Sequence, residues 1–231
     1  MDCLIADLKV RIPEAGGLAP RCREYLTALE GPADIIISEE TYNLDYWQGI
    51  DYDMACYMES GKLFYWSLPD FNGIMLHSSA VEYEGKVYLF SGPCTVGKST
   101  HTRLWQQRFG DAVRVINDDK PALRLIDGKW YAYGTPWCGK DGINQNRKAE
   151  LGGICFLRQS KENKIRRLSF PEATVAVMSQ TAKRFPKMET MEKALSLIDH
   201  LIRNVPIYEM ENFPSEEAVK LSYETMHLGN N

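Results

Sequence analysis

The sequence has 231 residues, of which 44% are hydrophobic and 25% are charged, and these proportions exclude wholesale disorder. A chain of this length suits one main core with a small subdomain attached. The formal net charge of -4 provides no global positive field, so we expect neither nucleic acid nor a membrane as a partner.

The first part of the chain, residues 1–73, is predicted to form a strand-rich N-terminal segment or subdomain. Three stretches run or alternate apolar over the length of a strand, with glycine and proline between them: residues 6–12, 33–40 and 53–59. Residues 22–31 have the pattern of a short helix that stops at a glycine. Aromatic side chains crowd residues 63–76, and we interpret them as packing residues rather than as a ligand platform.

The second part, residues 74–231, is predicted to form an α/β domain around a mixed sheet. Residues 74–91 predict a hairpin whose two-residue turn is Glu84 and Gly85. Residues 99–110 suit an amphipathic helix that ends at a glycine. A strand, a glycine-containing loop and a helix therefore follow one another here.

The rest of this domain is predicted to combine strands and helices. A strand over 112–119 precedes a hairpin over 121–134 that turns at Asp127 and Gly128. A long polar loop (134–150), a buried strand (151–159) and a basic turn (161–167) follow. The remaining pattern is mainly helical, over residues 171–179, 190–204 and 215–227, with Ser215 as the N-cap of the last helix.

The segment GPCTVGKS at residues 92–99 matches the Walker A pattern of two glycines separated by four residues and followed by lysine and serine. The glycines let successive backbone amides point at phosphate oxygens, and the next helix directs its N-terminal dipole at the same anion. We expect Lys98 to neutralise the β and γ phosphates and Ser99 to ligate Mg2+. The predicted ligands are ATP and Mg2+, and the predicted nucleotide-binding residues are Gly92, Pro93, Cys94, Thr95, Val96, Gly97, Lys98, Ser99 and Thr100.

Asp118 and Asp119 end an apolar strand about twenty residues after this loop, where a second metal-binding carboxylate is needed. Neighbouring residues of a strand point to opposite faces, so both acids can serve one site only if the strand ends or kinks there. The nearby Pro121 favours such a kink. One aspartate would then hold the metal and the other would accept a proton, without an assignment of either role. A solvated turn is the alternative interpretation.

His77 lies fifteen residues before Gly92, on the strand expected to pair with the strand that leads into the loop. Its side chain could reach the two aspartates, although a lone histidine is more often structural. In the long polar loop, four residues could donate to phosphate or substrate: Lys140, Asn144, Asn146 and Arg147. Exposure to solvent explains those four equally well.

With these motifs identified, the chain resembles the small kinases related to HPr kinase/phosphorylase and, more distantly, the kinase part of ATP-dependent phosphoenolpyruvate carboxykinase. The resemblance lies in LHSSAV, SGPCTVGKST, INDDKP and GTPWCGK, which follow in this order within about residues 74–158. It implies a P-loop in a mixed sheet, with His77, Asp118 and Asp119 clustered at the γ phosphate. It also implies a serine hydroxyl of a small protein or peptide as acceptor.

The sequence thus predicts an ATP-dependent kinase for a hydroxyl on a peptide, a protein or a small molecule. Its catalytic residues would be His77, Lys98, Asp118 and Asp119, and its metal ligands Ser99, Asp118 and Asp119. The alternatives are a regulatory or accessory protein that binds nucleotide without transfer, and a hydrolase. Six cysteines without a CxxC pair, and no secretory signal, predict a cytoplasmic location. The acceptor stays open, as does whether the chain is a homo-oligomer.

Overall fold

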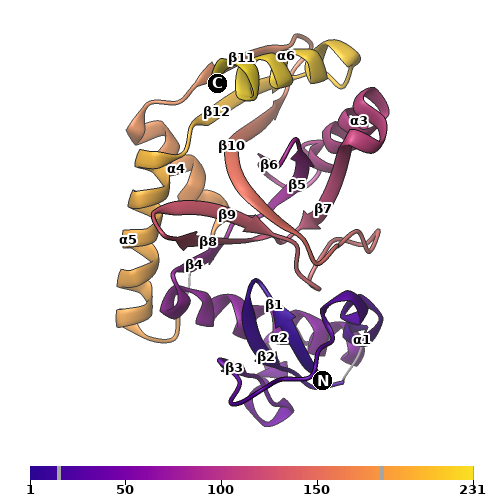
Figure 1. Ribbon diagram of the computed structural model, residues 1–231, viewed down its shortest axis with the longest axis vertical. Helices are drawn as coiled ribbons and strands as arrows, with labels where there is room; N and C mark the ends of the chain where they lie inside the picture. Colours follow the sequence, from indigo (N-terminus) through magenta and orange to yellow (C-terminus); the bar gives the residue numbers. More distant parts are fainter. Residues whose placement is uncertain (15–16, 183–184, 231) are drawn as a thin grey trace.

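The computed structural model describes residues 1–14, 17–182 and 185–230 and has a mixed α/β architecture (Figure 1). Within these residues, nine strands form one curled sheet in the order β4-β8-β9-β10-β6-β5-β7, with β12 beside β10 and β11 beside β12. The strands are β4 (Gly73–Met75), β5 (Ser78–Tyr83), β6 (Lys86–Ser91), β7 (Val113–Asp119), β8 (Ala122–Ile126), β9 (Lys129–Tyr133), β10 (Lys148–Gln159), β11 (Lys164–Arg167) and β12 (Ile207–Asn212).

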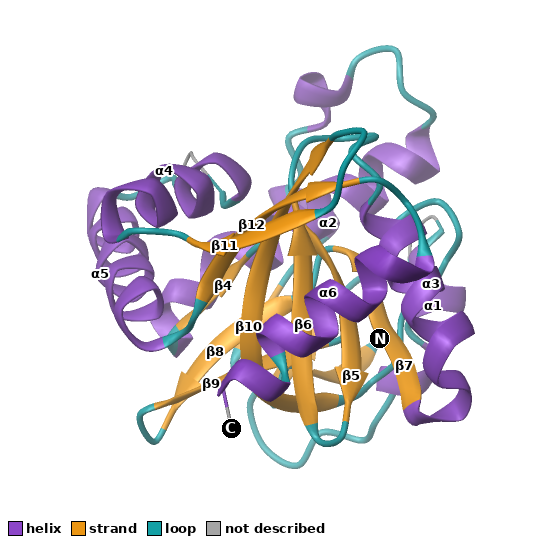
Figure 2. Ribbon diagram, turned by 90° about the horizontal axis from the view of Figure 1, so that it is seen from above, coloured by secondary structure: helices purple, strands orange, loops and turns teal. Residues whose placement is uncertain are grey.

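Helices cover both faces of this sheet (Figure 2). The helices α4 (Phe170–Gln180) and α5 (Met188–Asn204) pack on one face, where Val177 and Leu201 join a core with Leu89 of β6. The helices α3 (Lys98–Phe109) and α6 (Glu216–Met226) cover the other face through residues such as Trp105 and Val219. None of the helices in the described ranges is long and apolar enough to cross a membrane.

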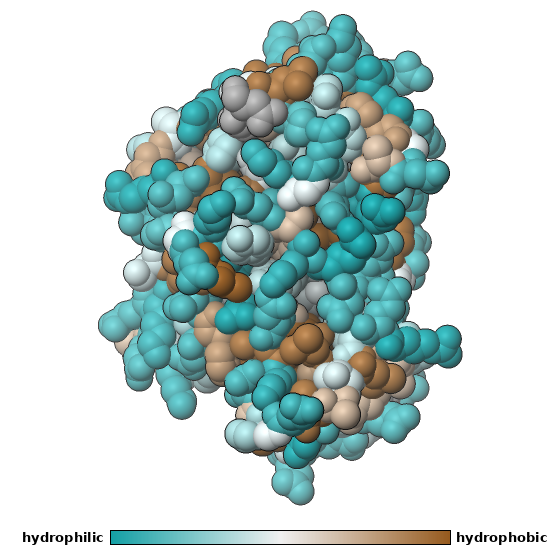
Figure 3. Space-filling model, viewed as in Figure 1, coloured by the Kyte–Doolittle hydropathy of each residue, from teal (hydrophilic) through white to brown (hydrophobic). Residues whose placement is uncertain are grey.

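The N-terminal part has a small sheet of its own, made of β1 (Asp2–Ile5), β2 (Leu8–Arg11) and β3 (Ile35–Ile36). Beside it lie α1 (Leu18–Arg21) and the longer α2 (Tyr52–Ser67). Its core includes Trp137 of the larger domain, whose ring stacks on Phe64 of α2 at a centroid distance of 4.7 Å. Apolar side chains reach the surface over this part, in the lower region of Figure 3.

Short 3-10 helices occupy Arg23–Tyr25, Glu39–Thr41, Leu44–Trp47, Leu68–Phe71, Gly110–Ala112 and Leu228–Asn230.

Both predicted two-residue turns are confirmed. Glu84 and Gly85 have φ values of 48° and 76°, and Asp127 and Gly128 have 48° and 78°. Two consecutive positive φ angles are the signature of the type I′ turn, whose twist matches that of the flanking strands.

Three sequence predictions are wrong. Residues 53–59 belong to helix α2 rather than to a strand, and the Asp51 side chain caps this helix by accepting from the Met54 amide at 3.3 Å. Residues 22–31 contain only a 3-10 turn at Arg23–Tyr25, because the chain turns extended at Leu26. Residues 164–167 form strand β11 instead of a turn, because they pair with β12, which lies between the last two predicted helices.

Candidate functional site

The loop over residues 92–97 joins β6 to α3, which confirms the predicted order of strand, loop and helix. Gly92, Thr95 and Gly97 have φ values of 139°, 67° and 107°, so the backbone curls repeatedly within six residues. A Cβ atom at Gly92 would lie 3.0 Å from the carbonyl oxygen of Leu157, a contact that leaves little room for a side chain. The amides at the start of α3 have no partner within the helix, as an anion-binding loop requires.

Lys98 and Ser99 begin helix α3 and face different partners. The Lys98 Nζ atom donates to the carbonyl oxygens of Gly92 and Pro93, at 3.1 and 3.2 Å. Burial lowers the pKa of Lys98 because it disfavours the charged form. The Ser99 hydroxyl donates to Oδ1 of Asp118 at 3.0 Å, which links the helix to the end of β7.

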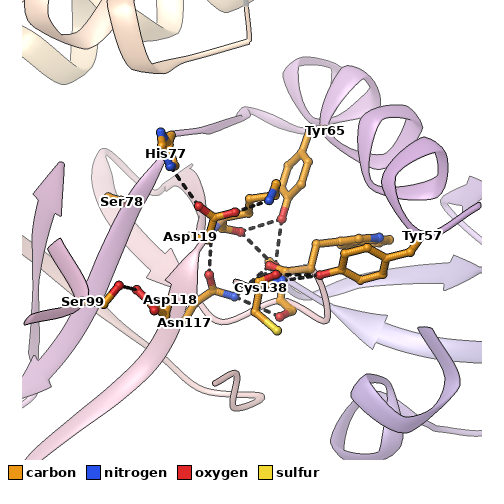
Figure 4. Close-up of polar contacts among 12 residues, drawn as sticks. Tyr57, Tyr65, His77, Ser78, Ser99, Asn117, Asp118, Asp119 and Cys138 are labelled. Carbon is orange, nitrogen blue, oxygen red and sulfur yellow. Dashed lines mark hydrogen bonds and ion pairs between the residues drawn. The ribbon is translucent and has the colours of Figure 1, made fainter. Parts of the chain in front are cut away.

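Asp119 has a separate set of partners from Asp118 (Figure 4). Its Oδ1 lies 2.9 Å from Nε2 of His77, and its Oδ2 forms an ion pair with Nζ of Lys120. Burial opposes ionisation of Asp119, but His77 and Lys120 outweigh it and hold the pKa of this carboxyl well below its usual value. The other ring nitrogen of His77 lies 3.0 Å from Oε1 of Gln180, at the end of α4.

A kink at the end of β7 brings the two aspartates to one cavity. Asp119 has a φ of 116°, far from the extended angles of a strand residue. Asp118 and Asp119 therefore line the same space instead of pointing to opposite faces of the sheet. The sequence argument required such a kink, and the structure confirms it.

The cavity has a volume of about 440 Å³, and its wall includes His77, Lys98, Ser99, Asp118, Asp119 and Lys140. It is also lined by four predicted nucleotide-binding residues, Cys94, Thr95, Gly97 and Thr100. Pro93 and Val96 border an adjoining hollow of about 320 Å³ on the other side of the loop. The structure thus gathers both aspartates, the histidine and the start of α3 around one space.

Three residues of the long polar loop have partners away from this cavity. The side chain of Asn144 donates to the carbonyl oxygen of Gly142 at 3.4 Å and to the Cys138 sulfur at 3.3 Å. Asn146 bonds to Glu24 in the N-terminal part. Arg147 makes a two-point ion pair with Glu82 at 2.7 and 3.0 Å. None of the three lines the cavity, so among the four candidates of this loop only Lys140 does.

Sequence reasoning missed several residues of the cavity. Arg103 lies one turn after Ser99 on α3, and it forms an ion pair with Asp141 of the polar loop across the cavity. The four-residue spacing from Ser99 is the signal that would have placed Arg103 on this side of the helix. Gly139 also lines the cavity, and its amide donates to the carbonyl oxygen of Asp118 at 2.5 Å. Sequence reasoning also passed over Lys120, which forms an ion pair with Asp119 but does not line this cavity.

The oxygen atoms of Ser99 and Asp118 fit a magnesium ion. Magnesium prefers hard oxygen ligands and is usually held by one or two protein groups together with phosphate oxygens and water. No group of three or more His, Cys, Asp or Glu side chains suited to a metal occurs among the described residues. With one hydroxyl and one carboxylate as ligands, such a site would leave positions for phosphate oxygens and water.

Comparison with known proteins finds similarity among solved structures alone. No family model matches the chain, and no curated protein matches it either. Among solved structures, the chain is similar to the Hpr(Ser) kinase/phosphatase from Coxiella burnetii. The two share 11% sequence identity with a TM-score of 0.37, over 67% of this chain and 94% of that chain.

Proposed function

We propose that this protein is an ATP-dependent P-loop kinase that transfers the γ phosphoryl group to a hydroxyl of a peptide, a protein or a small molecule. One observation carries the proposal: two adjacent carboxylates face one cavity at the start of α3 but have different partners. Asp118 is bonded to the hydroxyl that a P-loop uses for its metal, whereas Asp119 is bonded to a histidine and a lysine. This separation supports two distinct roles.

In this proposal the loop over residues 92–97 holds the phosphates through its amides, and Lys98 leaves its two carbonyl partners to neutralise the phosphate oxygens. Ser99 and Asp118 hold magnesium, which when bound offsets the negative charge between the β and γ phosphates. Lys140 adds positive charge to the same space, whereas the charge of Arg103 is balanced by Asp141. These residues bind and orient the donor but take no proton.

Asp119 is proposed to receive the proton of the acceptor. The acceptor oxygen attacks the γ phosphorus and forms a new P–O bond, while the bond to the β phosphate oxygen breaks and ADP leaves with its electrons. The transition state of such transfers is loose, so the hydroxyl loses its proton late and a weak base suffices. A carboxylate with a lowered pKa is ionised at neutral pH and can accept a hydrogen bond from that hydroxyl.

The rival function is a regulatory protein that binds nucleotide without transfer. Such a protein needs one carboxylate for the metal, and it has no use for a second one paired with histidine. The pairing of His77 with Asp119 therefore favours the kinase. A hydrolase remains a third candidate, and it would release phosphate from ATP when no acceptor is present.

The two carboxylates can be tested separately with Asp118→Asn and Asp119→Asn. Transfer from ATP is measured in a single turnover on a degenerate library of serine and threonine peptides and on simple alcohols, with phosphate release without acceptor recorded beside it. Binding of a non-hydrolysable ATP analogue with magnesium is measured by calorimetry. We expect both variants to lose transfer by at least about 100-fold. Asp119→Asn should keep its nucleotide affinity within about threefold, and Asp118→Asn should lose the magnesium-dependent part.

Asp111→Asn provides the matched control, because Asp111 is an exposed aspartate just after α3 and outside the cavity. It should transfer phosphate like the wild type. Nucleotide binding by the wild-type protein without transfer to any hydroxyl would favour the regulatory protein. Full transfer in both aspartate variants would refute the proposed chemistry.

A further inference from the structure

A second cavity, of about 200 Å³, lies beside the candidate phosphate site and is walled largely by aromatic rings. Its walls include Trp47, Tyr65, Trp66 and Trp137, which come from three separate parts of the chain. We call it the aromatic cavity. Neither the nucleotide nor the transfer chemistry proposed above makes use of it.

We call the cavity lined by Lys98, Asp118 and Asp119 the phosphate cavity. The aromatic cavity lies next to it, and a narrow ridge of protein separates the two. Three segments contribute to both, each with one residue in the aromatic cavity and a residue one or two positions away in the phosphate cavity: Met75 and His77, Lys120 and Asp119, and Trp137 and Gly139. Consecutive Cα atoms are about 3.8 Å apart, so one or two residues separate the two spaces. The proposed base, Asp119, stands at this boundary.

The polar atoms of three of these four aromatic side chains, those of Trp47, Tyr65 and Trp137, are already bonded within the protein. The Tyr65 hydroxyl bonds to the carbonyl oxygen of Lys120 at 2.6 Å and lies 2.8 Å from the Thr135 hydroxyl. The indole NH of Trp137 donates to Ser60 at 3.1 Å, and that of Trp47 donates to Glu59 at 2.7 Å. Ring surfaces are therefore what these side chains offer to an occupant, and the bonds fix them in place.

The two lysines at the aromatic cavity also have partners. Lys62 lies 2.6 Å from Oε2 of the buried Glu59, and its ammonium sits over the Trp66 ring at 4.8 Å. Lys120 is paired with Asp119. Because each ammonium is matched by a carboxylate, the space suits an apolar group better than an anion. About 150 Å³ is enough for a benzene ring in a protein interior, so a ring-sized group fits.

Further hollows continue from the aromatic cavity along the N-terminal part. Trp66 also borders a hollow of about 240 Å³ that Ile36 and Ile37 share. The same two isoleucines border a third hollow of about 360 Å³ next to Arg11 and Ile12. Shared residues thus join a row of three hollows from β3 to the edge of the phosphate site. A row of this kind matches an extended chain rather than a small alcohol.

We propose that the acceptor is a peptide segment that carries a ring-sized apolar side chain one or two residues from the phosphorylated serine or threonine, and that this side chain occupies the aromatic cavity. The proposal rests on the kinase function proposed above and specifies its substrate. The apolar side chain anchors the peptide, and the hydroxyl then reaches Asp119 across the ridge. The rest of the peptide follows the hollows toward β3.

The test uses serine peptides of one length that differ only in the neighbour of the serine, which is phenylalanine, leucine, alanine or glutamate. The measured quantity is kcat/KM for phosphoryl transfer. We expect phenylalanine to exceed alanine by about 10- to 100-fold, the discrimination that burial of one apolar side chain provides. Trp66→Ala should reduce this preference at least about fivefold while nucleotide affinity stays unchanged. Tyr52→Ala is the matched control, because Tyr52 is an exposed aromatic residue of the same helix that does not line the aromatic cavity.

A second measurement does not depend on transfer. A peptide with 4-nitrophenylalanine beside an alanine in place of serine should quench the fluorescence of the wild-type protein with saturation, because its ring lies against three tryptophans. Equal kcat/KM for all four neighbours, with transfer intact, would overturn the anchor and leave the kinase standing. Transfer to simple alcohols but to no peptide would also overturn the anchor and leave the kinase standing. Saturable quenching without transfer to any hydroxyl would support the peptide site and reject the kinase, and the absence of both would reject both.

Discussion

His77 and Asp119 meet at 2.9 Å although they are 42 positions apart in the sequence, because β5 pairs with β7 so that Ser78 lies opposite Asp119. The same strand β5 pairs with β6, with Ser78 opposite Ser91, the residue before the loop. Strand β5, which lies between β6 and β7, therefore places the histidine, the acid and the start of the loop side by side. This pairing is the structural basis of the predictions for His77 and Asp119 below.

Replacement of His77 by glutamine should remove a partner of Asp119 without changing the loop that is proposed to hold the nucleotide. We expect the rate of transfer to fall by about 100-fold, because loss of a residue that positions the base typically costs this much. The affinity for a non-hydrolysable ATP analogue should stay within about threefold. His200→Gln is the control. His200 belongs to α5, accepts a hydrogen bond from Trp130 and does not line the cavity. A rate within threefold of the wild type would show that His77 has no part in transfer.

The stability contributed by Asp119 should depend on pH in a defined direction. Its pKa in the fold lies below the ordinary value of 3.8, so the ionised carboxylate stabilises the fold above that pH. This contribution is lost as the pH falls through the lower, folded-state pKa. Asp119→Asn should therefore lower the Tm at pH 7, and the difference in Tm from the wild type should shrink below about pH 4. A difference that stays constant between pH 7 and pH 2.5 would contradict the ion pairs with His77 and Lys120.

Two substitutions in the glycine loop should change stability in opposite directions. Thr95 holds a φ of 67°, which is costly for a β-branched residue, so Thr95→Gly should raise the free energy of unfolding by about 0.5–1 kcal/mol. Gly97 has a φ of 107°, so Gly97→Ala should lower the free energy of unfolding by about 1–2 kcal/mol. Urea denaturation without nucleotide measures both. Destabilisation by Thr95→Gly would mean that the threonine side chain contributes more than its backbone costs.

Among the glycines that the structure describes, Gly134 is predicted to be the least able to carry a side chain. A Cβ atom there would lie 1.9 Å from the carbonyl oxygen of Gln145 and 2.6 Å from that of Ile116, and neither backbone group can rotate away. Gly134→Ala should therefore destabilise the protein by about 2–4 kcal/mol. Gly229→Ala is the control, because its nearest neighbour would be at an ordinary 3.6 Å. Equal Tm values for the two variants would show that the backbone at Gly134 adjusts freely.

Local signals in the sequence sufficed for the centre of the candidate site. The two turns, the loop with its flanking strand and helix, and the kink at Asp119 all depend on residues within a few positions of one another. Glycine at positive φ and a proline after an acidic pair are strong local constraints. The same short-range geometry would also have identified the side of α3 that faces the cavity, although Arg103 was missed.

Helix α2 escaped prediction because its buried side does not follow a simple apolar stripe. Its buried residues include Glu59, Ser60 and Gly61, and polar groups on the buried side blur the helical period. Gly61 is a poor helix former, but the absence of its side chain leaves room for Trp137, since a Cβ atom would lie 2.7 Å from that ring. A tertiary contact across many residues therefore decided the structure, and only the cap Asp51 offered a local signal.

Long-range contacts also decided the roles of residues that look alike in the sequence. Asn146 and Arg147 have the same polar character as Lys140, but Glu24 and Glu82 hold them elsewhere. The aromatic segment was interpreted as packing, which holds for the buried Phe64 and Tyr65. Trp66 is only half-buried and borders two hollows, a distinction that depends on neighbours far away in the chain.

The turn of the backbone at Asp119 also constrains how this protein can vary in length. Asp118 and Asp119 are consecutive residues with different partners. The register in which β7 pairs with β5 fixes the position of each. Strand β7 already has one extra residue opposite β5, between Val115 and Asn117. A further deletion or insertion of a single amino acid in this strand would displace both side chains at once, because strand residues alternate sides. Functional homologues should therefore keep the length of this strand unchanged, while gaps in their alignments should gather in the loop after β9.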